Sequence, residues 1–189
     1  MSLPQAVEFS HTLMEKYVEP GDTVLDATCG NGYDTVYLAE LVGNEGLVKA
    51  IDIQEEAVNN TTTRLRRQNL EERAEIIRGD HSRLEKLFSG EEFAGIIFNL
   101  GYLPGGDKDV ITEKNTTLKA LDQALDRIVI GGVIVVVAYP GHEGGRKECK
   151  AVREWAENLD PDPYNVLHYH FINQPSHPPQ VFAIELRES

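Results

Sequence analysis

The chain has 189 residues, a formal net charge of −13 at pH 7 and 41% hydrophobic residues, which is typical of a globular protein with one domain over residues 1–189. The excess of carboxylates argues against nonspecific nucleic-acid binding, because affinity for phosphates depends on Lys and Arg. No apolar run is long enough to span a bilayer, no signal segment is expected, and two cysteines give no disulfide framework, so we expect a cytoplasmic location.

Apolar runs alternate with helical patterns along the chain, which predicts βαβ units and a mostly parallel sheet. The predicted strands before the last helix are 23–28, 47–53, 74–78, 94–100 and 133–139. The predicted helices are 4–17, 34–42, 55–69, a short helix after Ser82, 112–130 and 145–159. No helix separates the last two predicted strands, 166–172 and 181–186, so we expect a hairpin with an antiparallel member at the sheet edge.

A glycine turn, residues 26–35, joins the first predicted strand to its helix. This order places backbone N–H groups and a helix N-terminus beside a ligand. Asp52 ends the second strand, where a carboxylate accepts hydrogen bonds from ribose hydroxyls. Thr35 replaces the third glycine of the dinucleotide fingerprint, and Asp26 and Asp34 add negative charge. A cationic cofactor such as S-adenosylmethionine therefore fits better than NAD. The alternative is an ordinary βα turn that has only a structural role.

Ligands of open α/β sheets bind at the carboxyl ends of the strands, so cofactor contacts are expected after strands one to four. Asp80 is expected to accept a hydrogen bond from an adenine amine, to cap the next helix, or to do both. The expected cofactor-binding residues are Asp26, Thr28, Gly30, Asn31, Gly32, Asp34, Thr35, Asp52, Gln54, Asp80, His81, Asn99 and Gly101.

The fourth strand ends in Asn99-Leu100-Gly101-Tyr102. Methyltransferases that act on amines often carry Asn/Asp-Pro-Pro-Tyr at this point, where polar oxygens orient the amine and the ring stacks on a planar substrate. This chain keeps the polar and aromatic ends but replaces both prolines. The alternative is a glycine-rich loop with Tyr102 packed on the surface.

Polar residues that follow the later strands are candidates for binding the substrate and accepting its proton. Asn99 and Tyr102 are expected to be catalytic, with Asp107 and His142 as candidate proton acceptors. We favour an amine that binds already deprotonated and is only oriented by Asn99. The expected substrate-binding residues are Tyr102, Pro104, Gly105, Lys108, Tyr139, His142, Arg146, Lys147, Asn173 and Gln174. The sequence contains no metal-binding pattern.

Several of these segments together resemble a bacterial rRNA-methylase family that is associated with methylation of the tRNA wobble uridine. The resemblance is carried by residues 26–32, 34–35, 52–54, 99–104, 106–108, 141–142, 144–145 and 171–174. It implies a Rossmann-like methyltransferase fold with a seven-stranded, mostly parallel sheet, helices on both faces and a C-terminal antiparallel hairpin. It also implies methyl transfer from S-adenosylmethionine to the amine of 5-aminomethyl-2-thiouridine in tRNA, without an appended RNA-binding domain, and it is compatible with a homodimer.

Other functions stay open at this stage. An rRNA substrate or a small-molecule amine is compatible with the same motifs, and the acidic composition suits the small amine. Arg146 and Lys147, which begin a basic stretch after the fifth strand, favour RNA, although they also suit a solvated helix face. A noncatalytic module that binds S-adenosylmethionine is the alternative from another class.

Overall fold

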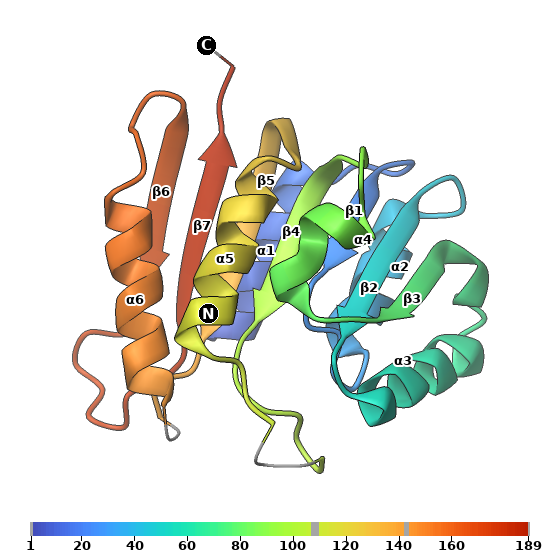
Figure 1. Cartoon of the computed structure of the whole chain (residues 1–189), viewed down its shortest axis with the longest axis horizontal. Helices are drawn as coiled ribbons and strands as arrows, with labels where there is room; N and C mark the ends of the chain where they lie inside the picture. The colour runs from blue at the N-terminus through green and yellow to red at the C-terminus, as the bar shows by residue number, and fades with distance from the viewer. Residues whose placement is uncertain (1, 107–109, 142–143, 189) are drawn as a thin grey trace.

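A seven-stranded sheet with the strand order β3-β2-β1-β4-β5-β7-β6 forms the centre of the part of the chain that the computed structural model describes, residues 2–106, 110–141 and 144–188 (Figure 1). The strands are β1 (Thr23–Asp26), β2 (Leu47–Asp52), β3 (Ala74–Arg78), β4 (Phe93–Asn99), β5 (Ile128–Ala138), β6 (Tyr164–Tyr169) and β7 (Gln180–Leu186). The first five strands are parallel, and β7 pairs antiparallel with both β5 and β6. The predicted fold class is confirmed.

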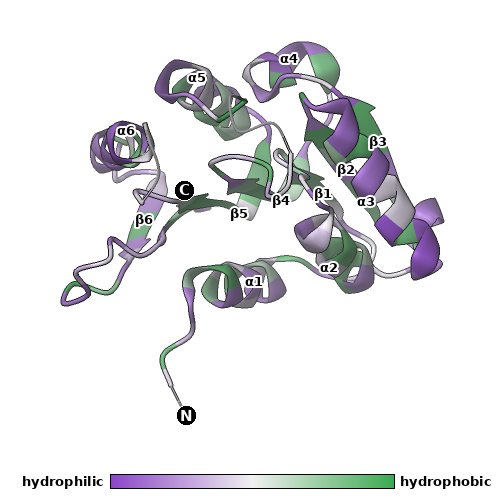
Figure 2. Ribbon diagram, turned by 90° about the horizontal axis from the view of Figure 1, so that it is seen from below, coloured by the Kyte–Doolittle hydropathy of each residue, from purple (hydrophilic) through white to green (hydrophobic). Residues whose placement is uncertain are grey.

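Helices cover both faces of the sheet (Figure 2). They are α1 (Ala6–Tyr17), α2 (Tyr33–Val42), α3 (Glu55–Arg67), α4 (Leu84–Leu87), α5 (Lys114–Leu125) and α6 (Gly145–Glu157), with short 3-10 turns at Glu71–Arg73 and His81–Arg83. Figure 2 shows α4, α5 and α6 on one face and α1 and α2 on the other. Leu65 of α3 belongs to the same buried hydrophobic cluster as residues of α1 and α2.

Strand residues divide between two buried clusters because successive side chains point to opposite faces. In β4, Ile96 and Phe98 pack under α4, α5 and α6, whereas Ile97 packs under α1 and α2. In β5, Ile134 and Val136 belong to the first cluster, and the intervening valines belong to the second. Such continuous apolar runs are expected for strands that are covered on both faces.

Two predicted boundaries were wrong. The helix predicted at 112–130 ends at Leu125, and β5 begins already at Ile128, where a run of β-branched residues favours a strand. The strand predicted at 166–172 is β6, which begins at Tyr164 and ends at Tyr169. Ile172 was assigned to that strand for its apolar character, yet it lies in the following turn with 86% of its surface exposed.

The sheet places the functional edge at the carboxyl ends of the parallel strands. Because β1 lies between β2 and β4, the chain runs outward to β3 and then returns to the other side of β1. This reversal is the switch point at which open α/β sheets bind ligands. α5 and α6 begin at the same edge, the lower one in Figure 1. Within the described residues, none of the helices has the length and apolar character needed to cross a membrane.

Candidate active site

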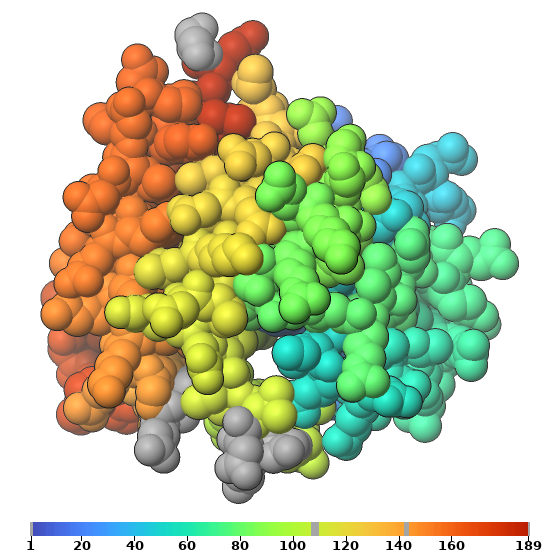
Figure 3. Space-filling view, viewed as in Figure 1, coloured from blue at the N-terminus to red at the C-terminus, as the bar shows by residue number. Residues whose placement is uncertain are grey.

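A cavity of about 1100 Å³ opens at the carboxyl ends of the parallel strands. Figure 3 shows a hollow at this edge, between the yellow-green segment that follows β4 and the cyan segment that follows β2. Ten of the expected cofactor-binding residues line the cavity: Thr28, Gly30, Asn31, Asp34, Asp52, Gln54, Asp80, His81, Asn99 and Gly101. Most of the residues that were expected at the carboxyl ends of the strands therefore lie on the wall of one cavity.

Asp26, the first residue of the glycine turn, does not line the cavity, so its expected contact with a cofactor stays a prediction. It is fully buried, and its carboxyl accepts hydrogen bonds from the Thr35 hydroxyl at 2.6 Å and the Thr28 backbone N–H at 3.2 Å. Burial and the nearby charge of Asp34 raise the pKa of Asp26 to about 8. Asp26 therefore holds the two ends of the turn in place and keeps its proton near neutral pH.

Gly32 and Thr35 belong to the glycine turn but do not line the cavity. Gly32 has a φ of +79°, and a Cβ atom there would stand 2.8 Å from the Cα atom of Thr61. Only glycine fits, because the backbone conformation disfavours other residues and α3 leaves no space for a side chain. Asp26, Gly32 and Thr35 thus shape the turn without lining the cavity, and their direct contacts with a cofactor stay predictions.

The carboxylate of Asp52 organises the next strand end while facing the cavity. One oxygen accepts the Gly30 N–H at 3.0 Å, and the other accepts the Gln54 N–H at 2.9 Å. Each carboxylate oxygen can accept a further hydrogen bond. Asp52 and Gln54 both line the cavity, so the predicted ribose acceptor lies where a ligand can reach it.

Asp80 and His81 form the next part of the wall, after β3. Burial opposes ionisation of Asp80, but hydrogen bonds from the backbone and hydroxyl of Ser82 outweigh it and lower the pKa of Asp80. Asp80 therefore caps the 3-10 turn and also lines the cavity, as the sequence allowed. Burial lowers the pKa of His81, so its ring is neutral, and its buried Nε2 has no hydrogen-bond partner among the described residues.

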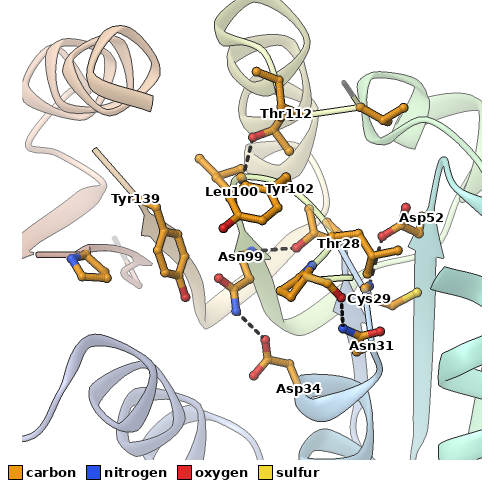
Figure 4. Close-up of a pocket in the computed structure, with 18 of the residues that line it drawn as sticks. Thr28, Cys29, Asn31, Asp34, Asp52, Asn99, Leu100, Tyr102, Thr112 and Tyr139 are labelled. Carbon is orange, nitrogen blue, oxygen red and sulfur yellow. Dashed lines mark hydrogen bonds between the residues drawn. The ribbon is translucent and has the colours of Figure 1, made fainter. Parts of the chain in front are cut away.

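Asn99, at the end of β4, is held by hydrogen bonds of both its backbone and its side chain. Its backbone N–H donates to the Thr28 hydroxyl at 2.6 Å, and its side-chain Nδ2 donates to Asp34 Oδ2 at 2.9 Å. The other oxygen of Asp34 is hydrogen-bonded to His11 Nε2 of α1 at 2.7 Å. Figure 4 shows Asn99 between Thr28 and Asp34, with the Tyr139 ring beside it. Burial and the charge of Asp34 raise the pKa of Tyr139, which keeps its hydroxyl protonated.

Tyr102 lies on the loop that follows β4, and backbone and side-chain contacts join the start of this loop to residues 111 and 112. Tyr102 forms an isolated bridge with Ile111, and the Gly101 N–H donates to the Thr112 hydroxyl at 2.8 Å. That hydroxyl donates to Glu148 Oε2 at 2.9 Å, a carboxylate of α6 that is only 3% exposed. Tyr102 lines the cavity with 45% of its surface exposed, as expected for a ring that meets a substrate.

Asn31 connects the glycine turn to the loop after β4. Its Nδ2 donates to the Pro104 carbonyl at 3.0 Å, and its Oδ1 accepts from the Asn60 side chain at 3.0 Å. Arg64 donates to the Asn31 carbonyl at 2.7 Å, and its guanidinium lies 3.6 Å from the centre of the Tyr33 ring. α3 therefore clamps the turn and fixes the distance between the two loops.

The remaining substrate predictions have different outcomes. Pro104, Tyr139 and Gln174 line the cavity, whereas Gly105 and Asn173 do not. Arg146 and Lys147 are exposed on the first turn of α6, and Lys147 lines a second, smaller cavity of about 360 Å³. Asp107, Lys108 and His142 lie outside the described residues. Gly105 has a φ of +89° and open space around it, so it serves the turn rather than the wall.

Sequence reasoning missed the cavity residues that no strand end supplies. They are contributed by the start of α1, by the segment before α5 and by the loop between β6 and β7: Gln5, Val7, Ile111, Thr112, Glu113, Thr116, Ser176, His177, Pro178 and Pro179. His11 was missed as well, because its contacts with Asp34 and Tyr37 of α2 arise from tertiary packing. Cys29 is buried, and burial raises the pKa of its thiol, so it is not a nucleophile.

Comparisons with known proteins agree with this geometry. Residues 48–185 match the family model described as "Putative rRNA methylase", and residues 1–83 match that of protein-L-isoaspartate O-methyltransferase. The chain is 36% identical to an Arabidopsis thaliana protein named "tRNA (mnm(5)s(2)U34)-methyltransferase, chloroplastic", over 96% of this chain and 69% of the relative.

Solved structures are similar over the whole chain. A protein of Clostridium thermocellum described as "putative rRNA-methylase" has a TM-score of 0.95 and 40% identity, with 98% of this chain and 100% of that chain covered. A protein of Streptococcus mutans described as "a putative methyltransferase", in complex with S-adenosylhomocysteine, has a TM-score of 0.88 and 34% identity, over 98% and 99% of the two chains.

Proposed function

The chain belongs to the rRNA-methylase family and is an S-adenosylmethionine-dependent methyltransferase, and from this premise we propose that it N-methylates the 5-aminomethyl group of (2-thio)uridine at the wobble position of tRNA. The Arabidopsis relative, whose printed name states this kind of substrate, supports the proposal. The observation that carries it is the orientation of Asn99 at the cavity wall.

The polar groups on the β1–β3 side of the cavity suit S-adenosylmethionine. Asp52 has acceptor capacity for ribose hydroxyls, and Asp80 suits the donors of an adenine ring. Asp34 places a carboxylate where a cationic methionine end is favoured. When bound, the cofactor supplies the methyl group.

Asn99 is arranged to recognise a hydrogen-bond donor. Asp34 accepts from the side-chain nitrogen of Asn99, and Tyr139 forms a further side-chain hydrogen bond with Asn99, so the amide is held in one orientation in which its oxygen can accept from a substrate. An amine N–H is such a donor, and accepting from it directs the nitrogen lone pair away from Asn99. Orientation of this kind lowers the barrier to a displacement between two bound groups, because the reacting atoms are already held in line.

A basic groove beside the cavity suits the RNA backbone. Lys114, at the start of α5, and Lys147 and Lys150, on α6, line the smaller cavity together with Glu113 and Glu154. Glu113 also lines the main cavity, so the two cavities adjoin. Lys150 pairs with Glu154 at 3.5 Å, whereas no ion pair is found for Lys114 or Lys147 among the described residues. Local positive charge of this kind offsets the overall charge of −13.

Transfer of a labelled methyl group tests the proposed substrate class. The enzyme is incubated with labelled S-adenosylmethionine and, separately, tRNA that carries unmethylated 5-aminomethyluridine, rRNA, or a pool of small primary amines. Labelling of tRNA alone is expected. Labelling of the amine pool with none in tRNA would instead favour the small-molecule alternative. One domain over residues 1–189, a homodimer and a cytoplasmic location remain predictions.

A further inference from the structure

We infer that His11 of α1 is a positioning residue for methyl transfer, because through Asp34 it fixes the Asn99 amide that orients the substrate amine. The inference rests on the proposed amine substrate. His11 comes from a helix that precedes every strand of the sheet, and no strand-end motif includes it.

The contact between His11 and Asp34 is short and sheltered from solvent. His11 Nε2 and Asp34 Oδ1 are 2.7 Å apart, and the two side chains are 24% and 8% exposed. Asp34 Oδ2 accepts from Asn99 Nδ2 at 2.9 Å, so a continuous chain of two hydrogen bonds runs from α1 to the end of β4. Each oxygen of the carboxylate therefore has one side-chain partner.

The second partner matters because Asp34 is a nearly buried carboxylate next to another acid. A buried carboxylate that lacks hydrogen-bond donors is costly and turns toward water or a new partner. The charge of Asp34 already contributes to the raised pKa of Asp26. With His11 in place, the plane of the Asp34 carboxylate is fixed, and Asp34 can hold the Asn99 amide in one orientation.

This support replaces the rigidity that two prolines provide in related amine sites. Leu100 and Gly101 follow Asn99 in place of the two prolines, so neither residue has the fixed φ that proline imposes, and Gly101 adopts a φ of +129°. Side chains in reacting sites stay accurate when neighbouring hydrogen bonds hold them. The path from His11 to Asn99 is such a restraint, and it comes from outside the loop.

His11 has a second contact that suggests a purely structural role. Its ring stacks on Tyr37 of α2 with centroids 3.8 Å apart and an interplanar angle of 6°, and the Tyr37 hydroxyl donates to the His11 carbonyl at 3.0 Å. These contacts join α1 to α2 whatever happens in the cavity. The test must therefore separate the ring stack from the hydrogen bond to Asp34.

Two variants make this separation. His11→Phe keeps a ring over Tyr37 but removes the donor to Asp34, and His11→Gln keeps an N–H donor but removes the ring. kcat and KM for tRNA are measured at saturating S-adenosylmethionine, and thermal unfolding checks that each variant is folded. We expect kcat of His11→Phe to fall by about ten-fold or more, whereas His11→Gln stays within about three-fold of wild type. KM for tRNA should change little in either variant.

The ratio of the two kcat values decides the outcome. If His11→Gln is no faster than His11→Phe, whether both are active or both impaired, the inference is overturned. Tyr37→Phe is the matched control, because it removes the hydroxyl contact to α1 and leaves the imidazole in place, and its kcat should equal that of wild type. A wild-type enzyme that labels only small amines would contradict the proposed tRNA substrate but not this inference, since the same ratio is then measured with the amine.

Discussion

The two sides of the cavity are built in different ways. On the cofactor side, Asp52 and Asp80 each accept a hydrogen bond from a backbone N–H two residues further along the chain, and Asp52 accepts another from the Gly30 N–H of the glycine turn. Where the glycine turn meets the substrate side, side chains from distant segments hold one another: Asn31 reaches a carbonyl 73 residues away, and Asp34 reaches Asn99 over 65 residues. Local geometry shapes the first side, and tertiary packing shapes the second.

This difference has consequences for substitutions. A change on the cofactor side removes one acceptor and alters affinity for one ligand. A change on the substrate side disturbs a set of coupled hydrogen bonds, and effects in such sets are larger than the sum of separate contacts. The predictions below are ordered by the size of the effect that this comparison implies.

The largest effect is expected for Asn99→Ala. The variant loses the acceptor for the substrate amine and leaves Asp34 Oδ2 without its side-chain partner, so kcat should fall by about 100-fold. Steady-state methyl transfer to tRNA measures it. The matched control is Asn165→Ala, which removes an exposed hydrogen bond to Glu185 on the far edge of the sheet and should leave kcat unchanged. A folded Asn99→Ala enzyme with full kcat would show that Asn99 does not orient the substrate.

Asp52→Ala should weaken cofactor binding. A charge-assisted hydrogen bond contributes on the order of 1.5–3 kcal/mol, so affinity for S-adenosylmethionine should fall by about ten-fold or more. Calorimetry with S-adenosylhomocysteine measures the change, and affinity for tRNA should stay the same. Unchanged cofactor affinity in the folded variant would remove Asp52 from the site and weaken the division between the two sides.

Tyr102 separates ring stacking from hydroxyl chemistry on the substrate side. Stacking on a base contributes roughly 1–3 kcal/mol, so Tyr102→Ala should reduce kcat/KM for tRNA by about five-fold or more while cofactor affinity is retained. Tyr102→Phe keeps the ring and should keep most of the activity. Equal impairment of both variants would assign the role to the hydroxyl, and full activity of both would make Tyr102 a packing residue.

The smallest effect per residue is expected in the basic groove. Reversing Lys114 and Lys147 to Glu should weaken tRNA binding and reduce its salt dependence by about one slope unit per lost contact. Cofactor affinity should not change, because both residues lie outside the main cavity. The matched control is the pair Lys16→Glu and Lys86→Glu, on α1 and α4 and absent from both cavities. A salt slope equal to that of wild type would identify the groove as a solvated surface.

The sequence predicted the cofactor side better than the substrate side for a physical reason. Asp52 and Asp80 were found because a polar residue at the end of an apolar run marks a strand end, which is a local signal. The loop between β6 and β7 reaches the cavity, and His11 reaches Asp34 at its wall, only through tertiary packing, which no local pattern encodes. Ile128 was misassigned because an apolar run after a helix fits either period until β-branched residues are weighed.

The central claim is that this methyltransferase acts on the 5-aminomethyl group of the tRNA wobble uridine. The most direct measurement is nucleoside mass spectrometry of tRNA treated with the enzyme and a donor that carries a trideuteromethyl group. The account predicts that the 5-aminomethyl nucleoside disappears as its N-methylated form gains the deuterated methyl group, and that Asn99→Ala abolishes most of this conversion. Deuterated methyl groups on another nucleoside, with the 5-aminomethyl form unchanged, would contradict it.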